Sequence, residues 1–350
     1  MNIKRMPRDR DYVESTDDLI FCVVDYIHPP NKVTAYLKYV PSNKGLWKKE
    51  DKIYKRVIPY YHVRSVKKAI NFLSRHYPQY VHECLVRGMI FSMVPYNLIK
   101  KLYFPEERLA EIIQNGPKDS LEQVVLDLTD LISSSTNVSH DKMGVTGSIL
   151  VGIHNPDFSD IDLTIYGLKN SYRVRNFIKE CLSSGNLQIR RIDKSLEKQL
   201  EEELVKSFKM DIDLARFVLS RRWNYAMFKG TPFSIHPIRS DMDITEKYGD
   251  RIYKFAGKGT IKAFIEDSTE SIFTPAIYKV SIWEAKGKLQ EIEEIVSFEG
   301  IFRDLFNEGD LIEARGKIEQ VITRRRTCYR LIIGSLEEEG GYIRPLKVGE

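Results

Sequence analysis

The sequence predicts a protein that combines the α/β and α+β classes. We expect a central mixed sheet with helices, flanked by a basic α+β N-terminal domain and a small β-barrel-like C-terminal domain. The chain has 350 residues, 42% of them hydrophobic, which suffices for two or three domains with buried cores. Strand-like and helical patterns alternate in the middle of the chain, and short strand-like runs fill its last part. These observations place the domains at 1–118, 119–240 and 241–350.

The first range predicts a small antiparallel sheet followed by helices. Its aromatic and β-branched runs, separated by turn-forming residues, cover 19–26, 33–39 and 52–60. Helical patterns follow at Ser65–His76 and at Pro105–Gln114, the second of which has proline at its start.

The middle range predicts a mixed sheet covered by helices. Asp119 or Ser120 is expected to cap a helix whose apolar residues recur with helical spacing up to Ile132. Strands interleaved with helices then indicate the sheet. The strand-like runs cover 145–153, 160–166 and 232–238, and the helical patterns lie around 172–182 and 196–207.

The last range predicts a β-rich domain. Short strand-like runs are separated by glycine and polar turns, a pattern typical of a sheet that closes on itself. These runs cover 261–265, 277–283, 311–319 and 329–333.

Charge is distributed unevenly between the three ranges. Residues 1–118 hold 21 Lys and Arg against 12 Asp and Glu, a net charge of +9. Residues 119–240 are neutral, and residues 241–350 carry −4. Only the first range has the positive balance that attracts nucleic acid or another polyanion.

Membrane and disulfide-stabilised classes are not indicated. Apolar runs stop far short of the roughly 20 residues that a membrane-spanning helix needs, so we expect no membrane partner. The cysteines lie far apart without a C-x-x-C pair, which argues against a disulfide framework or a structural zinc site. They are Cys22, Cys84, Cys181 and Cys328. A reducing cytoplasm fits this pattern, and we expect a cytoplasmic location.

One segment carries the strongest chemical signal. Gly144-Val-Thr-Gly-Ser148 precedes Ser159-Asp160-Ile-Asp162 by eleven residues. Residues two apart on a strand share a face, so Asp160 and Asp162 would project together, which is costly unless a cation lies between them. Two carboxylates favour Mg²⁺. The turn at Gly147 and Ser148 allows a phosphate chain to approach the backbone closely.

This ordered pattern resembles the DNA polymerase beta superfamily of nucleotidyltransferases, over residues 119–240. The resemblance implies transfer of a nucleoside monophosphate from a nucleoside triphosphate, ATP among the candidates, to an acceptor hydroxyl with release of pyrophosphate. It also implies that Gly147 and Ser148 bind the triphosphate, and that Asp160 and Asp162 hold two Mg²⁺ ions as catalytic residues. The whole chain is also similar to a group of archaeal predicted nucleotidyltransferases of similar length.

The sequence departs from that superfamily at the third metal-binding carboxylate. The superfamily commonly has an aspartate on a later strand, where this chain has Ser234. His236 shares the face of Ser234 by strand alternation, and a neutral imidazole can serve as a metal ligand or a base, so His236 is a candidate catalytic residue. Asp241 and Asp243 follow the strand and are further candidates for the missing charge.

A second Asp-x-Asp sequence, Asp211-Ile-Asp213, follows a helical pattern. Residues i and i+2 do not share a face of a helix, so we interpret this pair as helix-capping or surface residues.

Basic and aromatic residues interleave in residues 36–64 of the first range. Nucleobases stack on aromatic rings while phosphates pair with lysine and arginine, so this stretch suggests contact with single-stranded or tRNA-like RNA. The candidate RNA-binding residues are Trp47, Lys48, Lys49 and Lys55. A solvated sheet with its tyrosines on the packed face would explain the same residues.

Three functions therefore remain open. The first is an enzyme that adds nucleotides to RNA, the leading acceptor, and the second is an enzyme that modifies a protein or small-molecule hydroxyl. The third is a catalytically silent nucleotide- or RNA-binding protein. The sequence leaves the acceptor, the base and the oligomeric state open.

Overall fold

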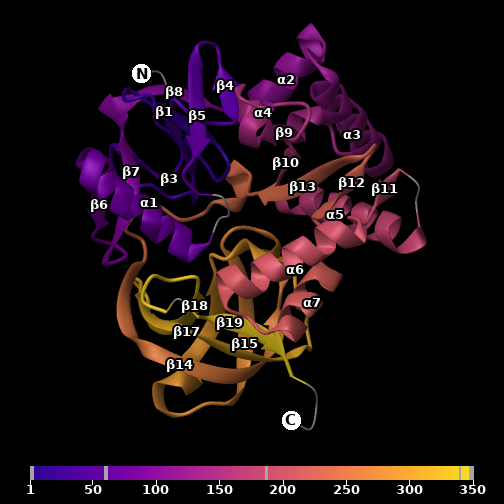
Figure 1. The fold of residues 1–350 in the computed structure, drawn as a ribbon. Helices are drawn as coiled ribbons and strands as arrows, with labels where there is room; N and C mark the ends of the chain where they lie inside the picture. Colours follow the sequence, from indigo (N-terminus) through magenta and orange to yellow (C-terminus); the bar gives the residue numbers. More distant parts are fainter. Residues whose placement is uncertain (1–3, 59–61, 186–187, 339, 347–350) are drawn as a thin grey trace. The chain divides into compact units, whose positions relative to one another are not determined.

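The computed structural model describes residues 4–58, 62–185, 188–338 and 340–346 (Figure 1). The chain forms two compact units, each assembled from three segments. Unit 1 comprises Met1–Ile58, Ser92–Lys194 and Trp223–Thr245, and unit 2 comprises Pro59–Phe91, Ser195–Arg222 and Glu246–Glu350. Each of the three ranges expected from the sequence is thus divided between the units.

The first sheet of unit 1 is antiparallel, as the sequence predicted. Its strands run in the order β4-β5-β3-β2-β1-β8, and β7 also pairs with β3 and with β6. The expected run at 52–60 is shorter as a strand, and its residues 59 and 60 lie outside the described residues. The strands are β1 (Tyr12–Ser15), β2 (Ile20–Val23), β3 (Lys32–Pro41), β4 (Trp47–Lys49), β5 (Lys52–Arg56), β6 (Val81–Cys84), β7 (Met89–Pro95) and β8 (Ile99–Tyr103). Of these, β6 and the start of β7 belong to the segment assigned to unit 2.

The second sheet of unit 1 is mixed, because β10 and β13 are parallel while the other pairs are antiparallel. Its order is β11-β12-β13-β10-β9. The strands are β9 (Met143–Thr146), β10 (Ile161–Tyr166), β11 (Ile189–Arg190), β12 (Tyr225–Phe228) and β13 (Thr231–Ile238). The mixed sheet predicted for the middle of the chain is therefore present.

Helices α2 (Pro105–Asn115), α3 (Ser120–Thr136) and α5 (Leu168–Ser184) accompany this sheet. Helix α2 contacts β9, whereas α5 contacts β10, β13 and α3. The Asp119 side chain caps α3 by accepting hydrogen bonds from the backbone N–H groups of Leu121 and Glu122, which confirms the predicted cap.

The strand expected at 145–153 is wrong beyond Thr146. Gly147 adopts a φ of +70°, which ends β9, and Gly147–Val151 forms the short helix α4. Ile149, Leu150 and Val151 are all buried, so this apolar run shows no alternation. A fully buried run cannot be assigned to strand or helix from its pattern alone.

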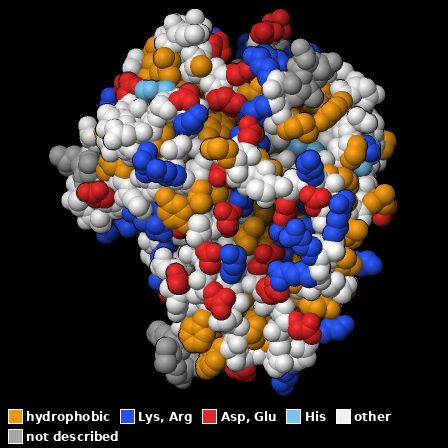
Figure 2. All heavy atoms as spheres, turned by 180° about the vertical axis from the view of Figure 1, so that it is seen from behind, with side chains coloured by type: hydrophobic (Ala, Val, Ile, Leu, Met, Phe, Trp, Pro, Cys, Tyr) orange, Lys and Arg blue, Asp and Glu red, His pale blue; other side chains and the backbone are white. Residues whose placement is uncertain are grey.

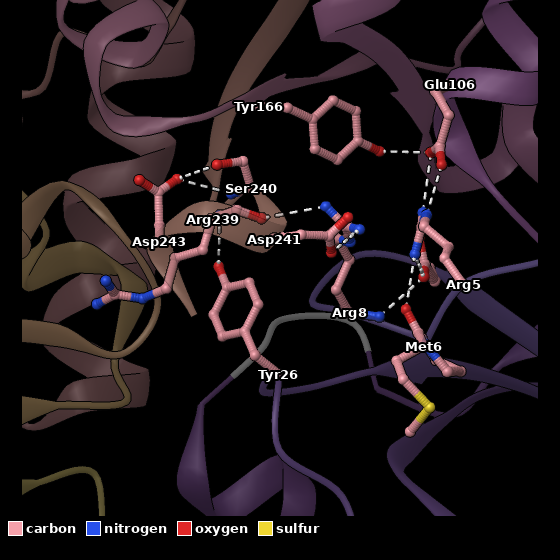
Figure 3. Close-up of polar contacts among 12 residues, drawn as sticks. Arg5, Met6, Arg8, Tyr26, Glu106, Tyr166, Arg239, Ser240, Asp241 and Asp243 are labelled. Carbon is pink, nitrogen blue, oxygen red and sulfur yellow. Dashed lines mark hydrogen bonds and ion pairs between the residues drawn. The ribbon is translucent and has the colours of Figure 1, made fainter. Parts of the chain in front are cut away.

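The N-terminal segment ties the two sheets of unit 1 together (Figure 3). The Arg5 guanidinium donates to both carboxylate oxygens of Asp11, at 2.6 and 2.8 Å, and its Nε donates to Glu106 of α2 at 2.6 Å. Glu106 also accepts a hydrogen bond of 2.7 Å from the Tyr166 hydroxyl at the end of β10. Arg8 pairs with Asp241, beyond the end of β13, at 2.7 Å. These partly buried charged hydrogen bonds hold the first sheet on the second.

Unit 2 contains a closed five-stranded barrel, as the sequence predicted. Strand β14 pairs with both β15 and β17, so the order β14-β15-β16-β18-β17 returns to its start, and β19 extends from β17. Figure 1 shows β14 as a long curved strand. Its register shifts at Gly257, where a β-bulge bends the strand. The strands are β14 (Ile252–Asp267), β15 (Ala276–Glu284), β16 (Ile292–Ser297), β17 (Leu311–Ile322), β18 (Thr327–Ile333) and β19 (Tyr342–Pro345).

Three further helices belong mainly to unit 2: α1 (Val63–His76), α6 (Lys194–Phe208) and α7 (Ile212–Arg221). The apolar residues of α6 and α7, Leu204 and Val218 among them, share one hydrophobic core with the barrel residues Ile261 and Tyr278. We expected the helix at 196–207 within the 119–240 domain, but its apolar stripe is buried with the barrel.

Asp211 caps α7 by accepting a 2.8 Å hydrogen bond from the Leu214 N–H, which confirms its interpretation as a capping residue. The four cysteines are free thiols. In the described ranges no helix is both long and apolar enough to cross a membrane.

Candidate functional site

Asp160 and Asp162 form an acidic pair at the start of β10. Asp160 immediately precedes the strand, and Asp162 is its second residue. The pKa of Asp160 is raised because the negative charge of Asp162 acts on it and because burial disfavours its ionised form. The two carboxylates therefore interact, although only Asp162 lies within the strand.

Ser234 and His236 hold the Asp162 carboxylate from the neighbouring parallel strand. Asp162 lies opposite Ser234 in the register of β10 and β13, and Thr164 lies opposite His236. The Ser234 hydroxyl donates to Asp162 Oδ1, and His236 Nε2 lies 3.2 Å from the same oxygen. Burial opposes ionisation of Asp162, but the hydrogen bond and charge of His236, together with Lys38 and Ser234, hold its pKa below the usual range.

This geometry assigns the proton on His236. The Ser234 hydroxyl has a single hydrogen, which it donates to Asp162. His236 Nε2, 2.7 Å from Ser234 Oγ and 3.2 Å from Asp162 Oδ1, must then carry a hydrogen and donate it. Through a protonated Nε2, His236 can orient Asp162 but cannot bind a metal or accept a proton at that nitrogen. Its role as a ligand or base through the other ring nitrogen stays a prediction.

Gly147 lies directly against the other oxygen of Asp162. Thr146, the last residue of β9, pairs with Asp162, and Gly147 follows it at a φ of +70°. A Cβ atom at Gly147 would lie 2.4 Å from Asp162 Oδ2. The next residue, Ser148, is buried. The structure thus brings the glycine-serine turn and the acidic pair together, whereas their proposed roles toward a triphosphate remain predictions.

Three basic side chains that the sequence analysis missed surround this pair: Arg10, Lys38 and Arg56. The charge of Asp162 acts on Arg10 and on Lys38, and the charge of Asp160 acts on Arg56. The backbone carbonyl of Arg10 accepts a 2.7 Å hydrogen bond from the hydroxyl of Thr146, the strand partner of Asp162. The first sheet therefore contributes to the site. Strand alternation alone could have placed Lys38 and Arg56 on faces of their strands, but not beside a second sheet.

The carboxylates of Asp160 and Asp162 fit a magnesium ion. Both are oxygen ligands of the kind Mg²⁺ prefers, and their mutual repulsion is what a bound cation relieves. Ser234 stands where a third carboxylate is expected and bonds to Asp162, so a second ion would meet a neutral hydroxyl there.

Asp241 and Asp243 do not supply that third carboxylate. They lie on a 3₁₀ turn, η4 (Asp241–Asp243), beyond Ile238, the end of β13. About 13 Å of strand separates Ser234 from Ile238. Asp241 pairs with Arg8, and Asp243 accepts hydrogen bonds from the backbone N–H and hydroxyl of Ser240, at 2.7 and 2.6 Å.

A second cluster of metal-ligating residue types has a structural role. Asp119, Glu122 and His154 bring their ligand atoms within 4.8 Å of one another. Asp119 caps α3 and lies 2.8 Å from His154 Nε2, while Glu122 pairs with Arg108 and accepts from the Lys118 N–H at 2.8 Å. These bonds occupy the carboxylates, so the cluster stabilises the start of α3.

Comparison with known proteins places the chain in a family. No family model matches it, and no solved structure matches it. The uncharacterized protein MJ1086 of Methanocaldococcus jannaschii is 30% identical over 335 residues, which cover 95% of this chain and 96% of that protein. The chain belongs to the family of MJ1086. Because the shared region covers 95% of the chain, the MJ1086 family shares sequence in both compact units.

The predicted RNA-binding residues do not share one face of the β4–β5 hairpin. Trp47 pairs with Tyr54 and Lys48 with Ile53, so by strand alternation Trp47 and Lys49 lie on one face and Lys48 and Lys55 on the other. Lys48 and Lys55 are exposed.

Trp47 and Lys49 already have partners within unit 1. The Arg56 guanidinium lies 5.0 Å from the Trp47 ring centroid, and Trp47 makes edge contacts with Tyr39 and Phe158 at 5.6 and 6.4 Å. Lys49 Nζ donates to the Tyr103 hydroxyl at 2.7 Å. The RNA role of these residues stays a prediction, and the exposed pair Lys48 and Lys55 is its better test.

Replacing Gly147 with alanine should disturb the acidic pair. Gly147 and Gly152 both have positive φ, near +70°, so alanine at either position costs about 1 kcal/mol. Only at Gly147 would the new Cβ meet the Asp162 carboxylate, because nothing lies within 4 Å of a Cβ at Gly152. We expect Gly147→Ala to lower the free energy of unfolding in urea by at least 1 kcal/mol more than Gly152→Ala. Equal losses for the two variants would contradict the close contact.

Proposed function

We propose that the protein is a magnesium-dependent nucleotidyltransferase that moves a nucleoside monophosphate from a nucleoside triphosphate to an acceptor hydroxyl. The observation that carries the proposal is the convergence of Gly147, Asp160 and Asp162, with one carboxylate held ionised by Ser234 and His236. Carboxylates paired at such a cost in repulsion are typical of a site that accepts a cation.

Each residue of the site has a role in the proposed reaction. Asp160 and Asp162 would hold Mg²⁺, which neutralises the triphosphate and stabilises the attacking and leaving oxygens when it is bound. Ser234 and His236 keep Asp162 ionised and oriented. Gly147, lacking a side chain, leaves the Asp162 carboxylate in place and the backbone open to the phosphates. The resemblance to the superfamily implies two Mg²⁺ ions, and this number is part of the proposal.

RNA is the acceptor that we propose first. The +9 charge of residues 1–118 favours a polyanion, and Lys48 and Lys55 are exposed in that range. Figure 2 shows one face of the molecule, on which Lys and Arg side chains are interspersed with Asp and Glu side chains. A protein or small-molecule hydroxyl as the acceptor, and a catalytically silent nucleotide-binding protein, are outcomes of the tests below.

The first test of the proposed reaction removes one carboxylate of the acidic pair. We expect the protein, incubated with each labelled nucleoside triphosphate, Mg²⁺ and either total RNA or total protein, to label one of them. Asp160→Asn should reduce this labelling by at least about 100-fold, because Mg²⁺ loses a carboxylate ligand. It should not lower the melting temperature, since it relieves the repulsion between the two aspartates.

Asp157→Asn is the matched control, because Asp157 is an exposed carboxylate in the same loop. The Asp157→Asn variant should label the acceptor at the same rate as the unaltered protein. Equal labelling by Asp160→Asn and Asp157→Asn would refute the proposed reaction site. Magnesium-dependent nucleotide binding without labelling of any acceptor would identify the silent alternative.

Ser234→Asp tests the missing third carboxylate. Ser234 lies opposite Asp162 and bonds to it, so an aspartate there would complete a cluster of three carboxylates. Without Mg²⁺ the added charge should lower the melting temperature, and millimolar Mg²⁺ should restore it. We expect transfer to rise by about 10-fold, as metal binding strengthens. A variant whose melting temperature ignores Mg²⁺ would show that no metal binds between these strands, and Ser234→Ala controls for loss of the hydroxyl.

Charge reversal on the exposed face of the β4–β5 hairpin tests RNA as the acceptor. Each lysine–phosphate contact contributes about 0.7 to the slope of log affinity against log salt for single strands. The double change Lys48→Glu and Lys55→Glu should therefore flatten this slope by about one to two. The control, Lys198→Glu with Lys288→Glu, changes the net charge equally in unit 2 and should leave the slope unaltered. Equal slopes in both double variants would remove these lysines from the RNA interface.

A further inference from the structure

Two basic side chains of the first sheet, Lys38 of β3 and Arg56 of β5, lie beside the acidic pair without an ion-pair partner of their own. Neither forms a salt bridge within the part of unit 1 that the structure describes, and both are partly buried. Other lysines of the same sheet are paired: Lys52 with Asp18 at 2.6 Å and Lys100 with Glu14 at 2.8 Å. Among the described residues, Lys48 and Lys55 also lack a salt bridge, but they are exposed to solvent, whereas Lys38 and Arg56 are partly buried.

The contacts of Arg56 lead to the loop that carries Asp160. Its guanidinium lies 5.0 Å from the Trp47 ring centroid, and Trp47 contacts Phe158, two residues before Asp160. The guanidinium Nη2 donates to the Tyr39 hydroxyl at 3.3 Å, whereas the buried Nε has no hydrogen-bond partner. The guanidinium fork therefore has donor capacity left.

Lys38 lies next to Arg56, and its positive charge interacts with both aspartates. The backbone N–H of Val57, the residue after Arg56, donates a 2.9 Å hydrogen bond to the carbonyl of Lys38. The backbone next to Arg56 is therefore hydrogen-bonded to that of Lys38. The charge of Lys38 acts on Asp160 and on Asp162, and that of Arg56 acts on Asp160. The described surroundings of the Lys38 ammonium otherwise include the Tyr36 ring, whose centroid is 6.0 Å away.

Two neighbouring cations repel each other in a partly buried site, and the nearby Asp160 and Asp162 offset only part of that cost. Burial lowers the pKa of Lys38, and the positive charge of Arg56 adds to this effect. An anion bound between them would relieve both costs, and a polyphosphate offers several charged oxygens to a lysine and an arginine at once. Arg10 differs, because Asp9 lies 3.7 Å from its Nε.

We propose that Lys38 and Arg56 bind the polyphosphate of the nucleoside triphosphate beside Asp160 and Asp162, an assignment that rests on the proposed function. The first sheet is then part of the nucleotide site itself. Asp160 and Asp162 would hold Mg²⁺, and Lys38 and Arg56 would hold the phosphates beside it.

The test is the affinity of the full chain for inorganic tripolyphosphate, measured by titration calorimetry without Mg²⁺. Lys38→Met and Arg56→Met should each weaken binding by at least about 10-fold, because each loses a charge-assisted contact to phosphate. Lys52→Met is the matched control. Lys52 shares β5 with Arg56 but is paired with Asp18, so its loss should change the affinity by less than about twofold.

Folding and binding are separated by two further measurements. Without ligand, Lys38→Met should melt close to the unaltered protein, since it loses both the repulsion from Arg56 and the attraction of Asp162. The charge-conserving variants Lys38→Arg and Arg56→Lys should keep most of the affinity. Equal affinity in Lys38→Met, Arg56→Met and Lys52→Met, or no binding of millimolar tripolyphosphate to the unaltered protein, would overturn the assignment.

The outcomes also distinguish this inference from the proposed reaction. Tripolyphosphate binding that depends on Lys38 and Arg56, in a protein that labels no acceptor, would support the phosphate site and refute the transferase. Nucleotidyl transfer whose KM for the triphosphate is unchanged in Lys38→Met and Arg56→Met would support the transferase and refute the phosphate site.

Discussion

The carboxylates of Asp160 and Asp162 repel each other, and the other residues of the candidate site compensate for this repulsion. Asp162 stays ionised because Ser234 and His236 donate hydrogen bonds to it, while the pKa of Asp160 rises. Gly147 leaves room for Asp162 Oδ2, which no other residue type would do without a clash. Two paired carboxylates cost stability, and nearby cations such as Lys38 and Arg56, or a bound metal ion, offset that cost.

The two sheets of unit 1 form one structure because the N-terminal segment bridges them with charged hydrogen bonds. Arg5 joins Asp11 to Glu106, and the Arg10 carbonyl accepts from Thr146, next to the acidic pair. This docking places the basic residues of β3 and β5 beside the aspartates of the second sheet. The positive charge of the N-terminal range is therefore divided: Lys38 and Arg56 face the site, whereas Lys48 and Lys55 are exposed on the hairpin.

Membership in the MJ1086 family and the chemistry of the site are independent findings. The shared sequence spans 95% of the chain, but the relative is itself uncharacterized, so the relationship identifies no substrate. The proposed transferase activity rests on the two carboxylates, and the hydroxyl of Ser234 makes the site unlike a cluster of three carboxylates. His236, which the sequence suggested as a ligand or base, is bound to Ser234 and Asp162 through a nitrogen that must carry hydrogen.

The sequence by itself determined the features that depend on neighbouring residues. Asp160 and Asp162 were predicted to interact from strand spacing, Asp119 and Asp211 to cap or lie outside helices, and the last part of the chain to form a barrel. The helix at Gly147–Val151 was missed, because a fully buried apolar run has no distinguishing period. The superfamily resemblance placed Ser234 and His236 near the acidic pair, but only the tertiary structure decided that both bond to Asp162 and that Lys38 and Arg56 lie beside the pair. These residues lie about 70 to 120 positions away along the chain, and their proximity depends on strand register and on the docking of two sheets, which no local pattern encodes.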